Sequence, residues 1–292
     1  MNKKKITMFT SLVLGGCLLF GTVLVNASQL SGYEKYKQAV LDTKNLKNET
    51  AALKVSITDN GTSLADLTEN FKQNQAANAM SSSTAIKYGG NTQSINNYLQ
   101  DGKRIEKTSD SSEYLVSGAK NKKYEKKDKT ENPQVMQGIG VIIDTLVGSM
   151  KDGVTAIDNG NGTKNVNIQL NDTQITPLVN AVVSIAMAKD NEFNNKNQKA
   201  DIENLKNILP QLQSDVKVES VISSANINSN DVIASQSAKV ILSGKDASGK
   251  VHTIIINADL QLSNINSTTP DKVDLTGKQV KTIENGFKGH RD

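Results

Sequence analysis

The sequence predicts an α+β fold, in which an antiparallel sheet packs against an N-terminal helix and apolar central helices. Residues 51–116 and 216–265 mostly alternate apolar and polar side chains between short turns, which is typical of antiparallel strands. Residues 134–150 and 177–188 repeat apolar side chains at helical spacing instead, which indicates largely buried helices. The two periods together favour one mixed domain.

The first elements are a helix from Gly32 to about Asn45 and a strand over residues 51–58. Apolar side chains recur every three or four positions in the helix and every second position in the strand. The turn at Asp59-Asn60-Gly61 predicts a hairpin into a return strand over 62–74. The residues that carry these periods are Tyr33, Tyr36, Val40 and Leu41 in the helix and Leu53, Val55 and Ile57 in the strand.

The remaining strands are expected in two blocks that flank the central helices. The first block comprises 80–88, 92–99, 103–108 and 113–116, and the second comprises 216–227, 232–243 and 251–265. A hairpin is also expected to join 154–157 to 165–170, and a weaker helix is expected over about 200–213. We therefore expect a single domain over 28–280, followed by a flexible tail over 281–292.

The N-terminus has the pattern of an export signal, with three lysines before an apolar run from Ile6 to Val25. The pattern allows three outcomes: cleavage after Ala27, retention as a membrane anchor, or lipidation at Cys17 within Leu14-Gly15-Gly16-Cys17. Residues 1–27 are thus predicted to be a signal peptide or anchor. All three outcomes place the folded protein outside the cytoplasm, secreted or held at the outer face of the membrane.

Composition excludes several classes of function. The formal net charge of +4 includes the three signal lysines, so the mature chain is near neutral and no nucleic-acid partner is expected. Cys17 is the only cysteine and lies in the signal, which leaves no disulfide, thiolate metal site or cysteine nucleophile in the mature chain. We expect no cofactor, no metal and a monomer.

Three segments carry a resemblance to a known family: SGYEKY at 31–36, YLQDGK at 98–103 and GKDASGKVHT at 244–253. They resemble segments of the LolA-like superfamily of bacterial envelope lipoprotein and lipid carriers, and of uncharacterised exported proteins of Gram-positive, spore-forming bacteria. The resemblance implies an open half-barrel, a curved antiparallel sheet that wraps helices on its concave face. It also implies apolar ligand contacts and no catalytic residues.

The residues that could perform catalysis have no partners assigned by their spacing. His252 and His290 are the only histidines, and we expect His252 to be packed in a strand rather than to act as a base. The turn carboxylates are expected to cap local backbone groups. These are Asp59, Asp101, Asp172 and Asp246. The sequence therefore predicts no catalytic residue and no enzyme.

The leading functional hypothesis is an exported, non-catalytic envelope protein that accommodates a lipid or other hydrophobic ligand between its sheet and its helices. The alternative is a structural or regulatory envelope protein that docks a membrane-protein partner and holds no ligand. A lysine-rich loop could contact an anionic membrane surface. The predicted lining residues are Ile139, Ile142, Ile143, Leu146, Val179, Val182 and Val183, and the loop lysines are Lys120, Lys122, Lys123, Lys126, Lys127 and Lys129.

Overall fold

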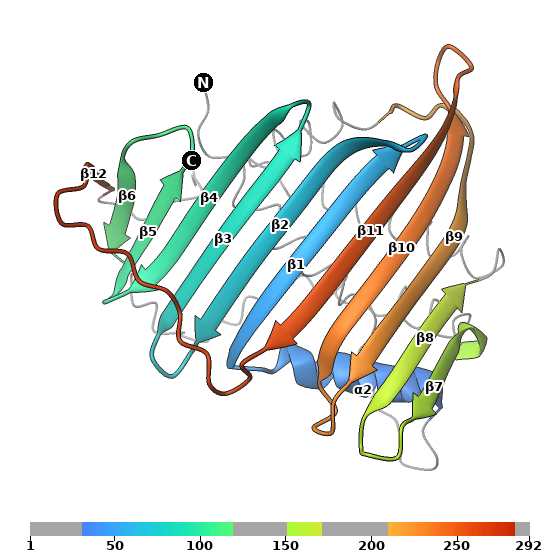
Figure 1. Cartoon of the computed structure of the whole chain (residues 1–292), viewed down its shortest axis with the longest axis horizontal. Helices are drawn as coiled ribbons and strands as arrows, with labels where there is room; N and C mark the ends of the chain where they lie inside the picture. The colour runs from blue at the N-terminus through green and yellow to red at the C-terminus, as the bar shows by residue number, and fades with distance from the viewer. Residues whose placement is uncertain (1–30, 119–150, 171–209, 284–292) are drawn as a thin grey trace, which may run out of the picture.

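The computed structural model describes residues 31–118, 151–170 and 210–283. These residues form one α-helix, one short 3-10 helix and a 12-stranded sheet (Figure 1). The helices are α2 (Gly32–Lys44) and η1 (Lys151–Gly153). The strands are β1 (Asn48–Asp59), β2 (Thr62–Asn74), β3 (Ala79–Tyr88), β4 (Asn91–Gln100), β5 (Lys103–Thr108), β6 (Tyr114–Gly118), β7 (Val154–Asp158), β8 (Lys164–Leu170), β9 (Ser214–Ile227), β10 (Ile233–Lys245), β11 (Val251–Ser263) and β12 (Val280–Thr282).

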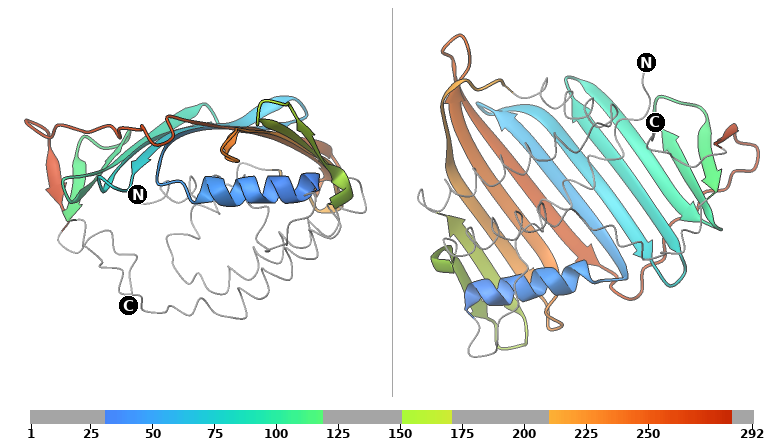
Figure 2. Two further views of the ribbon diagram at one scale, coloured as in Figure 1. Left: turned by 90° about the horizontal axis from the view of Figure 1, so that it is seen from below. Right: turned by 180° about the vertical axis from the view of Figure 1, so that it is seen from behind.

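The sheet is open, with strand order β12-β6-β5-β4-β3-β2-β1-β11-β10-β9-β8-β7. β1 pairs with both β2 and β11, which joins the N-terminal meander of strands to the C-terminal one. The pairings are antiparallel except that of β12, which runs parallel to β6. Figure 2 shows that the sheet is curved and that α2 lies across its concave side, at the β7–β10 end.

The predicted α+β class is wrong. The described chain is mostly β, with 61% of its residues in strands and 8% in helix. The physical reason is that alternation continues through twelve strands, whereas α2 covers one end of the concave face and forms no helical layer. The helices expected over 134–150 and 177–188, and most of that expected over 200–213, lie outside the described residues.

The N-terminal helix and the strands themselves are confirmed, because local signals specify them. Ser31 and Glu34 form a capping box, in which the Ser31 hydroxyl accepts from the Glu34 backbone N–H and the Glu34 carboxylate accepts from the Ser31 N–H. Asn60 and Gly61 both adopt positive φ, at 49° and 83°, as a two-residue hairpin turn with the strand twist requires.

A C-terminal strap, residues 264–279, crosses the strand ends on the face opposite α2, as Figure 1 shows. Its backbone is held by side chains of the sheet: Asn48 accepts from the Thr268 N–H, Ser81 from the Asp271 N–H and Gln100 from the Val273 N–H. The strap leads into β12, which pairs with β6. β12 covers residues 280–282, so it includes the first two residues of the tail predicted over 281–292.

Two clusters of buried apolar residues lie on the concave face. Gln236 of β10 donates to Tyr36 of α2, so its side chain points to the helix side, and its cross-strand partner Leu260 points the same way. The helix-side cluster comprises Tyr33, Tyr36, Ala39, Val40, Val154, Val166, Ile168, Leu170, Val221, Ala225, Ile227 and Ile233. The central cluster comprises Ala51, Leu53, Leu67 and Leu260, with Val55, Phe71, Ile86 and Leu262 packed against it.

Candidate binding face

The residues predicted to line a ligand site or to bind a surface lie outside the described residues. This holds for the apolar lining set at 139–146 and 179–183, for the lysine set at 120–129, for Cys17 and for His290. The structure does describe the sheet. The sequence-based prediction named no lining residue in the sheet, and the candidate site described below consists of sheet residues.

A contiguous band of half-buried apolar side chains lies on the concave face between the two clusters. Val240 lies directly opposite Ile256 on the neighbouring strand. Leu242 lies directly opposite Val218. We call five half-buried residues of this region, each larger than alanine, the concave band: Val55, Val218, Val240, Leu242 and Ile256. Val218 and Val240 pack against the helix-side cluster and Val55 packs against the central cluster.

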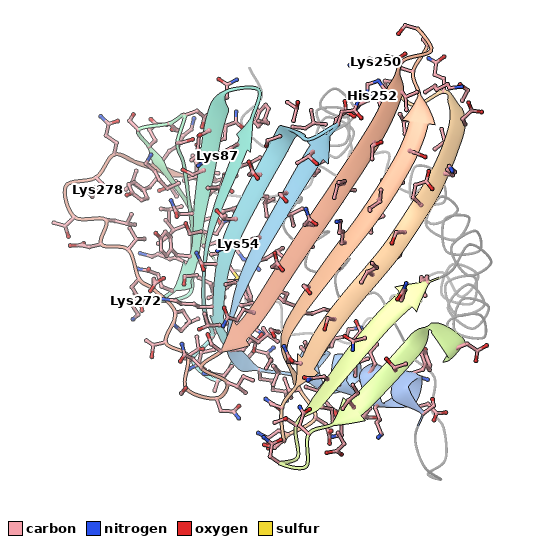
Figure 3. All side chains as sticks on the ribbon, turned by 45° about the vertical axis from the view of Figure 1, so that its right-hand side comes forward. Lys54, Lys87, Lys250, His252, Lys272 and Lys278 are labelled. Atoms are coloured by element: carbon pink, nitrogen blue, oxygen red, sulfur yellow. The ribbon has the colours of Figure 1, made fainter. Side chains whose placement is uncertain are left out.

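The two faces of the sheet differ in chemistry because the side chains alternate along each strand. On the convex face, Lys54 lies opposite Asp259 and Ser56 opposite Asn257, on the same strands whose other side chains form the central cluster. Figure 3 shows Lys54 and Lys87 on the face of the sheet opposite α2. Around β1 and β11, the convex face is thus polar and the concave face is mostly apolar.

One carboxylate, Glu69, interrupts the apolar concave face. Its directly opposite neighbours are Leu53 on β1 and Thr84 on β3, and the adjacent residues of its own strand on that face are Leu67 and Phe71. Glu69 is only 4% exposed, and its Oε2 atom has no hydrogen-bond partner. Burial raises the pKa of this carboxyl to about 7, because desolvation disfavours the charged form.

Two further carboxylates are buried on the same face, at greater distance from the central cluster. Glu49 lies opposite Gln73 and accepts a hydrogen bond from its amide. Burial raises the pKa of Glu49, and this hydrogen bond partly offsets the rise. Glu106 of β5 is 9% exposed. Glu49 thus has a polar partner within the sheet, and Glu69 does not.

His252, labelled in Figure 3, forms a polar cluster at the start of β11. Its Nδ1 lies 2.7 Å from Asp59 Oδ2 and its Nε2 lies 3.2 Å from Asp246 Oδ2. Hydrogen bonding to Asp59 is the largest cause that raises the pKa of His252, and hydrogen bonding to Asp246 is the next. The pKa of Asp246 is lowered, mainly by its hydrogen bond from Ser248 and next by that from His252. Asp246 also accepts from the backbone N–H of Lys250. Because His252 contacts both Asp59 and Asp246, it links the β1–β2 turn to the β10–β11 turn.

This cluster corrects one sequence-based expectation. His252 is packed, as expected, but it has two aspartate partners that spacing along the chain did not reveal. Asp59 is 193 positions away, and the β1–β11 pairing brings it beside the ring. Because both ring nitrogens face carboxylates and the side chain is 6% exposed, neither nitrogen is free to accept a proton from a substrate. The geometry is that of a structural clamp.

The described residues contain no helix long and apolar enough to cross a bilayer, and no group of three or more His, Cys, Asp or Glu side chains placed to hold a metal ion. No protein-family model matches the chain, and no curated protein matches its sequence. Among solved structures, the chain is similar to the "bifunctional dehydratase-cyclase domain in ambruticin biosynthesis". The identity is 13% over 86% of this chain and 89% of that one, with a TM-score of 0.14, which is too low to support any argument about fold or activity.

Proposed function

We propose that the protein is an exported, non-catalytic binding protein of the cell envelope that holds a lipid or other hydrophobic ligand against the concave face of its sheet. The observation that carries the proposal is the concave band, because its apolar side chains are only partly buried, whereas those of the two clusters beside it are buried. Contiguous apolar surface that keeps some contact with water is costly and is common at binding sites. Burying it under a ligand is worth roughly 25 cal/mol per Å².

Two sequence features support the setting of this function. The lysines and apolar run of residues 1–27 favour export, and the resemblance to LolA-like carriers favours an apolar ligand on the inside of a curved sheet. The open edges and curvature of the 12-stranded sheet are compatible with that resemblance. On this proposal the protein acts outside the cytoplasm as a carrier or receptor for an amphiphile.

A matched pair of isoleucine substitutions tests the proposal. Ile256 lies in the concave band, whereas Ile222 lies on the convex face of β9 and is 44% exposed. The full chain is titrated with the uncharged fluorescent probe N-phenyl-1-naphthylamine, and Ile256→Asn should weaken binding about tenfold, or ~1.4 kcal/mol. Ile222→Asn should leave binding unchanged.

Native mass spectrometry of protein exported by its host, followed by solvent extraction, gives the second measurement. A bound amphiphile in stoichiometric amount is the expected result. A wild-type protein that neither carries a ligand nor binds the probe would contradict the proposal, and would favour the alternative of a docking protein without ligand.

A further inference from the structure

The proposed function leaves the burial of Glu69 unexplained. A carboxylate at this position has apolar residues on three sides and Thr84 on the fourth, and the structure gives it no hydrogen bond or ion pair among the described residues. Burying a carboxylate without a partner is unfavourable, because its charged form loses hydration and gains no hydrogen bond. Other positions on this face of β2 hold Leu67 and Phe71, which carry no such cost.

The position of Glu69 links it to the proposed ligand. Leu53 lies directly opposite Glu69, and Val55 of the concave band is the next residue of β1 on that face. A ligand that lies along the concave band towards β2 would therefore bring one of its ends beside the Glu69 carboxylate. The strand order of the sheet places the apolar concave band beside the Glu69 carboxylate. An amphiphile, with an apolar chain and a polar head group, matches that combination.

The charges on this face favour a cationic group at that end. The buried charged side chains of β1 to β5 on the concave face are the carboxylates Glu49, Glu69 and Glu106. Arg104 of β5, on the same face, is exposed, and it lies two strands beyond β3. Within the described residues, then, the surroundings of Glu69 attract cations and contain no basic side chain that already neutralises it.

We infer that Glu69 is the head-group recognition residue of this site and that the ligand is an amphiphile with a protonated amine, which forms an ion pair with the Glu69 carboxylate. The inference rests on the proposed function. A charge-assisted hydrogen bond in a site shielded from water is stronger than one between neutral groups, so the amine should be strongly preferred over an uncharged group.

Three dodecyl compounds with different head groups test the inference: dodecylamine, dodecanol and dodecanoate. Each displaces the neutral probe from the full chain at about pH 8, where a carboxyl with a pKa of about 7 is mostly ionised and an alkylamine is protonated. Wild type should bind the amine about tenfold more tightly than the alcohol, and the carboxylate most weakly. Glu69→Gln should bring the amine and the alcohol to equal affinity, with alcohol binding retained.

Glu49→Gln is the matched control, because Glu49 is a buried carboxylate of the same face that already has a partner in Gln73. It should keep the preference for the amine. Should Glu69→Gln fail to fold, the wild-type ranking alone still tests the inference. Equal binding of the three compounds, or a preference for the alcohol, would overturn the inference and leave the proposed function standing. Failure of both the probe and all three compounds to bind would overturn both.

Discussion

The two halves of the concave face are built differently. The helix-side cluster is covered by α2, and hydrogen bonds join the helix to the sheet. Gln236 donates to Tyr36 and to Ser223, and the Thr43 hydroxyl accepts from the Ile233 N–H, while the Gln236 Oε1 atom has no hydrogen-bond partner. In the other half, Glu69 lies beside the central cluster and has no partner among the described residues, and the concave band borders this half.

This difference separates stability from function in the same sheet. A layer that α2 covers and that contains no buried carboxylate among the described residues contributes to folding, because it removes apolar area from water without the desolvation of a carboxylate. A half with partly buried apolar side chains and an unpaired carboxylate reduces stability, as binding sites commonly do. Substitutions in the two halves should therefore differ in their effects on stability and on binding.

The largest effect is expected from truncation in the helix-side cluster. Ile168 is 2% exposed, so Ile168→Ala should lower the free energy of unfolding by about 3 kcal/mol through lost burial and a residual cavity. Ile256→Ala, in the half-buried concave band, should cost only about 1 kcal/mol but should weaken probe binding. Urea denaturation and probe titration measure the two quantities. Equal losses of stability at the two sites would remove the distinction between the halves.

The next effect concerns Glu69 and depends on pH. Folding raises the pKa of this carboxyl from 4.5 to about 7, so between these pH values the folded state binds more protons at this site than the unfolded state. The contribution of Glu69 to the free energy of unfolding of the wild type therefore falls as pH rises from 4.5 to about 7. Glu69→Gln removes this dependence. Relative to wild type, the variant should gain about 2 kcal/mol between pH 5 and pH 8.

Denaturant midpoints at a series of pH values measure this gain, and Glu113→Gln, at an exposed site, serves as the control for loss of one carboxylate. The control should show no comparable change over the same pH range. A wild-type stability that rises from pH 5 to pH 8 relative to Glu69→Gln would contradict the burial of an unpaired carboxyl.

The strands and α2 could be predicted because their signals are local. Ser31 and Glu34 mark the start of the helix, and Asn60-Gly61 fixes the first hairpin. The fold class could not be predicted, because it depends on how many strands join one sheet. The β1–β11 pairing joins residues about 200 positions apart, and no local pattern specifies that partner.

The candidate site divides in the same way. Glu69 has a local signal that the prediction overlooked, since it shares its parity in β2 with Ala65, Leu67 and Phe71 and therefore faces the apolar side. The Asp59–His252–Asp246 cluster has none, because two turns at opposite ends of the chain must first be brought together. A polar residue at an apolar position of a strand can be found from sequence, whereas a cluster assembled by strand pairing cannot.

A smaller effect is expected where α2 is hydrogen-bonded to the sheet. Tyr36→Phe removes the hydroxyl that accepts the 2.6 Å hydrogen bond from the Gln236 amide and keeps the ring in the helix-side cluster. The free energy of unfolding should fall by only about 1 kcal/mol, because the Gln236 amide still donates to Ser223. Thermal denaturation measures it, and probe binding should not change. A loss of probe binding would mean that the two halves are coupled.

The smallest effect is expected at His252, at the outer end of the central half. His252→Gln keeps a side chain that can donate one hydrogen bond to Asp59 but removes the positive charge shared with Asp246. Because the pKa of His252 is raised in the folded protein, by Asp59 first, the charged ring stabilises the fold fully below its ordinary pKa of 6.5. This contribution is lost as pH rises through the raised value.

The variant should therefore melt below wild type at about pH 5.5, and the gap should narrow as pH rises into the alkaline range. Probe binding should stay the same, because the clamp joins two turns at the start of β11 and leaves Val240 and Ile256 in place. A gap that widens with pH would mean that the neutral ring is the stabilising form. A change in probe binding would mean instead that the two turns control access to the concave band, and the clamp would then belong to the binding half of the sheet rather than to its frame.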